Sequence, residues 1–275
     1  MSSSPIKVQW SGHTDVGRYR KENQDRFISL KIDSKNIYHL GKSGEDLLIN
    51  NSFIFAVSDG MGGANAGEYA SRAVIEQITF LLPKFINKKI YGIKNNIKSV
   101  LLELLLNVHN SITKLSKAYP DLSGMGATLS LCWLFNNKLY YAHIGDSKIY
   151  HLNKKGEFKQ ITRDDTYIQS LIDKGTITIY EAKEHQNRNL LQQVLGGKID
   201  KIDPQLGNIQ LNNGDRLLIC SDGLSEGLVD SSLKRYLQYC PVLIQEGNTL
   251  AKKMVDDSVR LDGKDNSTAI CLEIN

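Results

Sequence analysis

The sequence has few of the residues that mark a disulfide-rich or zinc-binding protein. It contains four cysteines, Cys132, Cys220, Cys240 and Cys271, and none of them stands in a Cys-x-x-Cys pair. Three of the four lie in apolar, strand-like runs, so we expect buried free thiols. This arrangement argues against a disulfide framework and against zinc held by cysteine.

Long apolar segments are also absent. The most apolar run, Val100–Leu106, is far shorter than the ~20 residues that a membrane-spanning helix needs, and Glu103 interrupts it. The first residues contain no apolar signal core. We therefore expect a cytoplasmic protein that does not associate with a membrane.

Charge of one sign is not in large excess. The chain has 34 basic and 30 acidic residues and a net charge of +4. The lysines of residues 84–98 are spread among apolar residues, which is typical of a solvated helix face or a loop. The sequence thus gives no sign of a nucleic-acid partner, and we expect a monomer.

Several catalytic signatures are missing. Residues 60–67 are rich in glycine but contain no Gly-Lys-Ser/Thr, so they do not form a P-loop. The sequence has no His-Glu-x-x-His and no Gly-x-Ser-x-Gly. These absences argue against a P-loop nucleotide hydrolase, a zinc protease and a serine hydrolase.

The hydrophobic pattern predicts strands that come in hairpins, with helices between them. Apolar stripes predict long helices over 67–82 and 97–117, and a last helix within 243–259. The predicted strands are 7–13, 26–31, 53–57, 128–135, 138–143, 148–152, 216–220 and 268–274. Hairpins of this kind favour an α+β fold with antiparallel sheets.

Three local features refine this picture. Asn136 and Asn137 predict a tight hairpin turn, and the polar residues 33–51 predict a long hairpin loop. Residues 162–191 predict a small helical flap. In that flap, Asp165 is expected to cap a first helix, and Thr178-Ile-Tyr-Glu181 is expected to form a capping box for a second.

Five aspartates share one setting, at the end of an apolar run and next to Gly, Asn or Ser. They are Asp25, Asp59, Asp146, Asp222 and Asp265. Two of them, Asp59 and Asp222, end strands as Ser-Asp-Gly. Carboxylate and carbonyl oxygens are the ligands that hard divalent cations prefer. Each aspartate taken alone also fits a turn or cap position, and that alternative stays open at this point.

Six motifs, in order along nearly the whole chain, resemble those of the metal-dependent PPM (type 2C) protein serine/threonine phosphatases of the bacterial single-domain type. They are Thr14-Asp-Val-Gly-Arg-Tyr-Arg-Lys-Glu-Asn-Gln-Asp25, Val57-Ser-Asp-Gly-Met-Gly-Gly63, Gly124-Met-Gly-Ala-Thr128, His143-Ile-Gly-Asp-Ser147, Ser221-Asp-Gly-Leu224 and Gly263-Lys-Asp-Asn-Ser-Thr268. The resemblance implies one domain over 1–275, built as an α-β-β-α sandwich of two antiparallel sheets flanked by helices, with the flap at about 162–191.

The resemblance also implies oxygen ligands for two Mg²⁺ or Mn²⁺ ions, and for a third ion described for bacterial relatives. The matching positions are Asp25, Asp59, Gly60, Asp146, Asp222 and Asp265. Asp59 matches the bridging carboxylate, and Arg20 matches the arginine that holds the substrate phosphate. The implied reaction is hydrolysis of phosphoserine or phosphothreonine by in-line attack of a hydroxide that bridges the ions, without a covalent intermediate.

Two positions depart from the family pattern. Gln24 stands where many members carry Glu, and Met61 stands where eukaryotic members carry a histidine that could act as a general acid. His13, His143 and His185 are alternative proton donors or structural residues. Arg18 is expected to point away from Arg20, and Lys148 to form a structural salt bridge.

The implied partners are phosphorylated proteins and a cognate Ser/Thr kinase. Gln24 leaves open a second hypothesis, a catalytically weak PPM-fold regulator that binds phosphoproteins. A third hypothesis is a phosphatase that acts on small phosphorylated metabolites or on an anti-sigma-factor antagonist.

Overall fold

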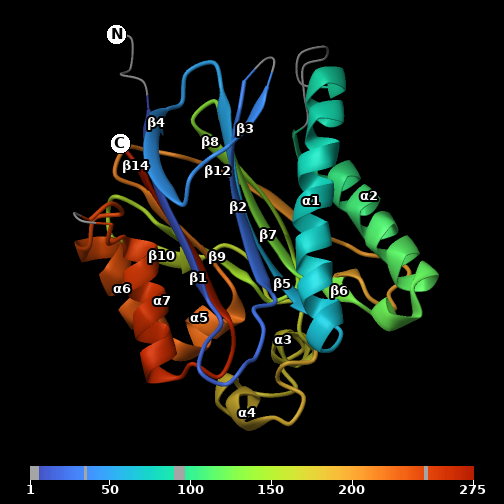
Figure 1. Cartoon of the computed structure of the whole chain (residues 1–275). Helices are drawn as coiled ribbons and strands as arrows, with labels where there is room; N and C mark the ends of the chain where they lie inside the picture. Colours follow the sequence, from blue (N-terminus) through green and yellow to red (C-terminus); the bar gives the residue numbers. More distant parts are fainter. Residues whose placement is uncertain (1–5, 34–35, 90–96, 245–246) are drawn as a thin grey trace.

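The computed structural model describes residues 6–33, 36–89, 97–244 and 247–275. Two antiparallel β-sheets pack face to face, and helices cover the outer face of each (Figure 1). The α+β, four-layer α-β-β-α sandwich predicted from the sequence is confirmed.

The first sheet has the strand order β11-β6-β5-β7-β8-β12, and β2 pairs with both β5 and β3. Helices α1 (Ala64–Lys89) and α2 (Ile97–Ala118) cover its outer face. The strands of this sheet are β2 (Asp25–Ile32), β3 (Ile37–His39), β5 (Ser52–Met61), β6 (Gly126–Ala127), β7 (Leu129–Phe135), β8 (Lys138–Ile144), β11 (Leu195–Gly196) and β12 (Gln205–Gln210).

The second sheet has the order β10-β9-β13-β14-β1-β4. Helices α5 (Asp222–Gly227), α6 (Asp230–Tyr239) and α7 (Leu250–Leu261) pack on its outer side. Its strands are β1 (Lys7–Asp15), β4 (Ser43–Leu47), β9 (Lys148–Leu152), β10 (Phe158–Gln160), β13 (Arg216–Cys220) and β14 (Ser267–Ile274).

The central strands are apolar on both faces because each face meets a different core. In β5, Phe53 and Phe55 point between the two sheets, whereas Ile54 and Ala56 point toward α1 and α2. This alternation follows from the two-residue period of a strand. A continuous apolar run is therefore required here, as it is in a sheet covered on both sides.

Both long helices predicted from the sequence are present. Helix α1 is longer than expected and continues through Pro83. A proline inside a helix removes one backbone hydrogen bond and costs about 3 kcal/mol. Leu82 and Phe85, on either side of the proline, are both buried in the core, and this burial offsets the cost.

Residues 33–51 connect β2 and β5, which pair antiparallel, so the predicted hairpin is present, but the prediction that the whole segment is a loop is wrong. This segment contains β3 and the edge strand β4, whose residues Ser43–Leu47 pair antiparallel with Lys7–Ser11 of β1. The strand escaped prediction because its sequence, Ser-Gly-Glu-Asp-Leu, is polar. Edge strands often carry such charged side chains, which discourage pairing with another chain.

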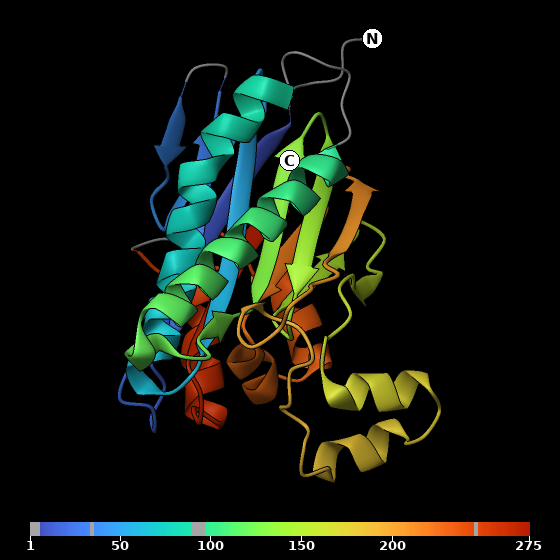
Figure 2. The ribbon, with the colours of Figure 1, turned by 90° about the vertical axis from the view of Figure 1, so that its right-hand side faces the viewer.

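The flap consists of α3 (Tyr167–Asp173) and α4 (Ile179–Glu184), which lie outside both sheets (Figure 2). The Thr178–Glu181 capping box is confirmed. The expected cap at Asp165 is wrong: Thr166 caps α3 by accepting a hydrogen bond from the Gln169 amide, 3.1 Å away. The Asp165 side chain is buried and accepts a hydrogen bond from the Gly145 amide, in the turn between β8 and β9.

Other expectations can be compared with the described residues. Asn136 and Asn137 both have positive φ, which confirms the tight turn between β7 and β8. Cys132, Cys220 and Cys271 are buried and free, and Cys240 is free and half-buried. Residues 90–96 of the lysine-containing stretch lie outside the described residues, and the single-domain boundary stays a prediction. No helix in the described ranges has the length and apolarity to cross a bilayer.

Candidate active site

The site lies where strands of both sheets end close together. Asp25 opens β2 and is the register partner of Asp59 in β5. Asp146 lies in the turn between β8 and β9, Asp222 follows β13, and Asp265 precedes β14. The fold therefore brings together five aspartates that are spread over most of the chain.

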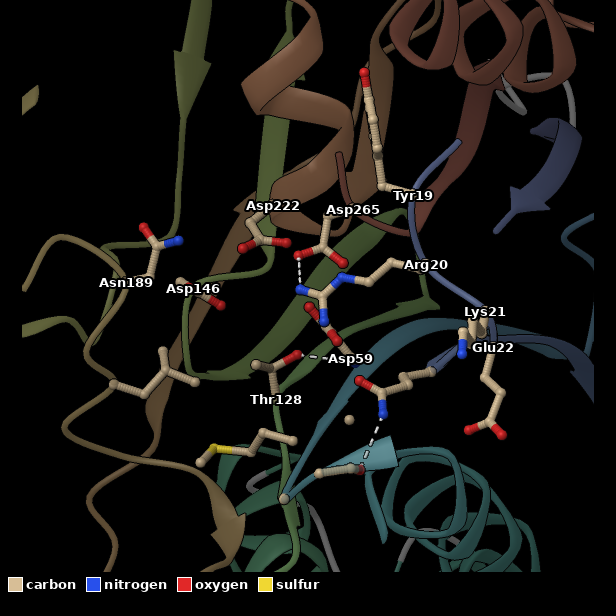
Figure 3. A pocket seen from close by; sticks show the side chains of 16 residues that line it. Tyr19, Arg20, Lys21, Glu22, Asp59, Thr128, Asp146, Asn189, Asp222 and Asp265 are labelled. Atoms are coloured by element: carbon tan, nitrogen blue, oxygen red, sulfur yellow. Dashed lines mark hydrogen bonds and ion pairs between the residues drawn. The ribbon is translucent and has the colours of Figure 1, made fainter. Parts of the chain in front are cut away.

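A pocket of about 530 Å³ contains four of these aspartates (Figure 3). Asp59, Asp146, Asp222 and Asp265 line it, as do Arg20 and Gly60. Asp25 does not line the pocket. Sequence reasoning missed further lining residues, namely Tyr19, Lys21, Glu22, Thr128, Asn189 and Leu191. All six lie in segments that the sequence had singled out, namely the first motif, the end of the third motif and the flap, but none of them had been given a role.

Asp25 is fully buried behind the pocket wall. Its Oδ2 accepts a hydrogen bond from the Ser221 hydroxyl at 2.7 Å, whereas its Oδ1 is buried and has no hydrogen-bond partner. Burial raises the Asp25 pKa to about 7; hydrogen bonds from Thr268 and Ser221 oppose this rise. An unpaired carboxylate oxygen in such a place is costly unless a cation meets it.

The pKa values of the neighbouring carboxyl groups are raised as well. Burial raises the pKa of Asp59 well above its usual range, and the charges of Asp25, Asp222 and Asp146 raise it further. Burial likewise raises the pKa of Asp146 and of Asp222. Acids crowded in this way repel one another, and such clusters are typical of functional sites.

Arg20 reaches into the acidic group. Its Nη2 donates to Oδ2 of Asp265 at 2.6 Å, and Figure 3 shows the guanidinium between the carboxylates of Asp265 and Asp59. Burial acts to lower the Arg20 pKa, but the hydrogen bond and charge of Asp265 outweigh it and raise the pKa. The guanidinium stays charged and keeps further N–H donors that are not used by Asp265.

Arg18, which the sequence analysis expected to point away from Arg20, makes hydrogen bonds near the site. The expectation that it points away from Arg20 was wrong even for an extended segment, because residues i and i+2 of a strand share a face. The segment is a turn, and the Arg18 Nη2 donates to the Asp262 carbonyl at 2.6 Å. The Arg18 backbone N–H also donates to the Gly263 carbonyl at 2.8 Å. Arg18 therefore supports the loop that carries Asp265, although it does not line the pocket.

Asn266 ties the loop that carries Arg20 to the loop that carries Asp265. Its Nδ2 donates to the carbonyls of Val16 and Glu22, at 2.9 and 3.0 Å, and its Oδ1 accepts from the Gln24 amide at 2.7 Å. Three hydrogen bonds from one buried side chain thus set the position of Arg20 relative to Asp265.

Thr128 fixes the backbone of Asp59. Its hydroxyl accepts from the Asp59 amide at 3.0 Å, its own amide donates to the Asp59 carbonyl at 2.8 Å, and its hydroxyl bonds to Ser147 at 2.5 Å. Because the β6 end and the Asp146 turn meet at Thr128, one residue aligns Asp59 and Asp146.

Gly60 and Gln24 pack against the start of α1. A Cβ at Gly60 would lie 1.9 Å from the Gly67 carbonyl oxygen, so only glycine fits there. The Gln24 side-chain amide donates to the Gly63 carbonyl at 3.1 Å. A glutamate at position 24 could not donate this bond, which gives the departure at Gln24 a structural role.

The turn that carries Asp146 is held by the base of the flap. The Asp165 Oδ2 accepts from the Gly145 amide at 3.0 Å, and the Asp165 amide donates to the Gly145 carbonyl at 2.6 Å. Lys148 donates to the Asp146 carbonyl at 3.0 Å and pairs with Asp164 at 2.7 Å. The expected structural salt bridge of Lys148 is therefore present.

The three histidines named as alternative proton donors lie away from the pocket lining. His143 is buried between the Ser130 hydroxyl and the Gly145 carbonyl, and burial lowers its pKa to about 4. His185 ends α4 and accepts from the Asn187 amide. His13 is in β1. Among the described residues, no histidine lines the pocket.

The donor set fits a hard divalent cation. As they stand, no three His, Cys, Asp or Glu side chains in the described chain enclose an ion by themselves. However, Oδ1 of Asp25 and Oδ1 of Asp222 are both buried without a hydrogen-bond partner. Oxygen ligands of this type, beside a glycine carbonyl, are those that Mg²⁺ and Mn²⁺ prefer.

Comparison with known proteins identifies the family. A family model described as Protein phosphatase 2C matches residues 45–258. The chain belongs to the protein phosphatase 2C family. Among curated members, it is 30% identical to Protein phosphatase PhpP of Streptococcus pneumoniae over 264 residues, which cover 95% of this chain and 96% of PhpP.

A second family member, PstP, extends the comparison in both sequence and structure. Serine/threonine protein phosphatase PstP of Mycobacterium tuberculosis is 35% identical over 84% of this chain, which spans only 42% of PstP. The crystal structure of the catalytic domain of PstP in complex with two manganese ions is 30% identical to this chain. It has a TM-score of 0.74 and covers 98% of this chain and 99% of its own. The architecture is therefore that of the phosphatase 2C family.

Proposed function

We propose that this protein is a metal-dependent protein serine/threonine phosphatase. The observation that carries the proposal is the single pocket in which Arg20 faces Asp59, Asp146, Asp222 and Asp265. A phosphoserine dianion needs a cationic grip, and a pocket of carboxylates is hostile to it unless cations are bound there as well. Homologues named Ser/Thr protein phosphatases support this reading.

The residues that would hold two divalent ions are Asp25, Asp59, Asp222 and Asp265, with the carbonyl of Gly60. Asp146 and Asp222 would hold a third. Bound there, Mg²⁺ or Mn²⁺ supplies a water activated at neutral pH and neutralises charge on the phosphoryl oxygens. The PstP structure with two manganese ions supports the binding of divalent metal, and the ligand residues and the third ion are proposals.

Arg20 would bind and orient the substrate phosphate. A guanidinium can donate two parallel hydrogen bonds to phosphate oxygens. The Asp265 contact and the Asn266 bonds hold it on the pocket side of its loop before substrate arrives. This preorganisation lowers the entropic cost of binding.

We propose hydrolysis without a phospho-enzyme. The pocket lining of the described chain contains no cysteine, histidine or serine, and the Thr128 hydroxyl is engaged with Asp59 and Ser147. We therefore expect water to be both the attacking nucleophile and the source of the proton for the leaving group. The alternative of a catalytically weak regulator rested on Gln24, whose bond to Gly63 gives it another explanation.

The finer statements on partners and location stay predictions. We propose phosphorylated proteins as substrates, a Ser/Thr kinase as the opposing enzyme, a monomeric state and action in the cytoplasm. Size-exclusion chromatography with light scattering and cell fractionation would test the last two.

The deciding experiment measures hydrolysis of p-nitrophenyl phosphate and of a phosphothreonine peptide, first in EDTA and then with Mn²⁺ or Mg²⁺. We expect turnover only with added metal. Folded protein that stays inactive with either ion would refute the proposal and favour the regulator.

A further inference from the structure

A second hollow of about 560 Å³ lies beneath the flap, between α3, α4 and α5. It shares Asp146, Asn189 and Asp222 with the catalytic pocket. Figure 3 shows Asn189 at the flap side of the catalytic pocket, next to Asp146. The two hollows therefore meet, and a ligand whose phosphate lies beside Arg20 can continue under the flap. We call this second hollow the flap groove.

The flap groove has an apolar side. Ile168 and Ile172 of α3 and Ile179 and Ala182 of α4 line it. Ile168 and Ala182 are buried, whereas Ile179 is 66% exposed. A second apolar side chain that covers Ile179 would remove apolar surface of both partners from water, at roughly 25 cal/mol per Å².

The charged groups of the flap groove largely cancel. Lys148 pairs with Asp164 at 2.7 Å, and Lys264 pairs with Asp262 at 2.8 Å.

The flap groove also contains Glu226 and Arg188, which carry opposite signs. Burial and the charge of Asp222 raise the Glu226 pKa, and the charge of Arg188 opposes this rise. With Asp146 and Asp222 assigned to metal, the groove offers no net charge to a ligand. An uncharged apolar side chain is thus the best match.

We propose that the flap groove binds the substrate residues next to the phosphorylated Ser or Thr and selects an aliphatic side chain there. This inference rests on the proposed function and adds a substrate class to it. Asn189, at the junction, can donate to and accept from the peptide backbone, which an extended substrate presents at each residue. A small aryl phosphate has no part that reaches the groove.

The test compares phosphothreonine peptides that carry Leu, Gly, Asp or Lys at each of the two positions on either side of the phosphothreonine. Hydrolysis of p-nitrophenyl phosphate serves as the reference reaction. We expect kcat/KM to be about fivefold higher for Leu than for Gly at one of these positions, with Asp and Lys no better than Gly. Equal kcat/KM across the set would overturn the inference and leave metal-dependent turnover, and so the proposed function, intact.

A matched pair of flap variants sharpens the test. Ile179 lines the groove, whereas its neighbour Tyr180 is 84% exposed and does not. In Ile179→Ala, we expect the ratio of kcat/KM for the Leu peptide to that for p-nitrophenyl phosphate to fall about fivefold. In Tyr180→Ala, the ratio should stay constant.

If the ratio of kcat/KM for the Leu peptide to that for p-nitrophenyl phosphate were the same in Ile179→Ala and Tyr180→Ala, the proposed role of the flap groove would be refuted. Fluorescence-polarisation binding of a phosphonate version of the Leu peptide gives the same comparison without turnover. It therefore remains decisive even if the enzyme proves inactive.

Discussion

Arg20 and Asp265 are 245 residues apart in sequence, yet the Nη2 of one lies 2.6 Å from the Oδ2 of the other. The pair joins a proposed phosphate-binding group to a proposed metal ligand. Both side chains are partly open to the pocket. The contact therefore holds Arg20 ready and still lets its remaining donors meet a substrate.

Replacing Arg20 tests its grip on phosphate. We expect Arg20→Ala to raise KM for a phosphothreonine peptide about 10- to 100-fold, because a charge-assisted contact of about 1.5–3 kcal/mol is lost. The effect on kcat should be smaller, and steady-state kinetics separates the two. Lys21→Ala is the control, since Lys21 lines the same pocket and carries the same charge.

Arg18→Ala is a poorer control because Arg18 supports the Asp262–Gly263 loop. Equal effects of Arg20→Ala and Lys21→Ala would deny Arg20 a special role.

Asp59→Asn should separate activity from stability. We expect kcat to fall by about three orders of magnitude or more, because the proposed bridging charge is lost. In EDTA at pH 8, the variant should melt a few degrees higher than the parent, since a half-buried carboxylate that repels its neighbours has been removed. Kinetics with Mn²⁺ and a thermal melt check both effects. Asp121→Asn, at an exposed acid of the 3-10 helix Pro120–Leu122, should change neither.

The acidic cluster should make the metal-free protein less stable at high pH. The folded-state pKa of Asp25, about 7, lies above the unfolded value of about 3.9. The native state therefore binds more protons than the unfolded state between these values, and the free energy of unfolding falls as pH rises through the window. Burial raises the pKa values of Asp59 and Asp146 as well, so these groups add to the fall. We expect Tm in EDTA to drop by about 5 °C or more from pH 6.5 to pH 8.5, and Mn²⁺ to reverse the drop.

Two features keep this pH experiment specific. Starting at pH 6.5 avoids the separate loss of stability at lower pH that His143 causes, because its folded-state pKa of about 4 lies below the unfolded value. In Asp25→Asn, the drop should shrink. A drop of the same size in the variant would show that other groups are responsible.

Asp165→Asn should loosen the turn that carries Asp146. An amide at this position places a donor against either the Gly145 amide or the Gln205 side-chain amide, both of which now donate to the carboxylate. We expect a loss of about 1–3 kcal/mol in the free energy of unfolding and a higher Mn²⁺ concentration for half-maximal activity. Urea unfolding and isothermal titration with Mn²⁺ report the two quantities. Asp173→Asn, in the same flap but paired with Arg163 on the surface, is the control and should leave Mn²⁺ affinity unchanged.

Much of the fold could be predicted because its signals are local. The alternation in β5, the asparagine turn at Asn136 and Asn137, and the Thr178–Glu181 capping box each depend on a few adjacent residues. Strand β4 could not be predicted in this way, because a polar edge strand is recognised only by the β1 partner that it meets. Helix α1 is longer than predicted because the burial of Phe85 in the core offsets the free-energy cost of Pro83 inside the helix.

The proposed ligands could be named from sequence because each stands in a recognisable motif, at or next to one end of a strand. The residues that hold these ligands and Arg20 in position could not be predicted from the sequence. Thr128 aligns Asp59, and Asn266 positions the Arg20 loop, through bonds between residues far apart in sequence. Asp165 looked like a helix cap because its neighbour Thr166 carries the same local signal. Side-chain roles that depend on long-range contacts leave no pattern in a single sequence.

The position of β14 has a consequence for how the molecule comes to be active. This strand follows every other element of the described residues, yet it lies inside its sheet between β13 and β1, and Asp265 stands two residues before it. A growing chain therefore cannot complete the catalytic centre until its last strand has inserted between two that are already made. Contacts of such long range are slow to form. Until they do, the nascent protein has no complete site with which to remove phosphate from its neighbours.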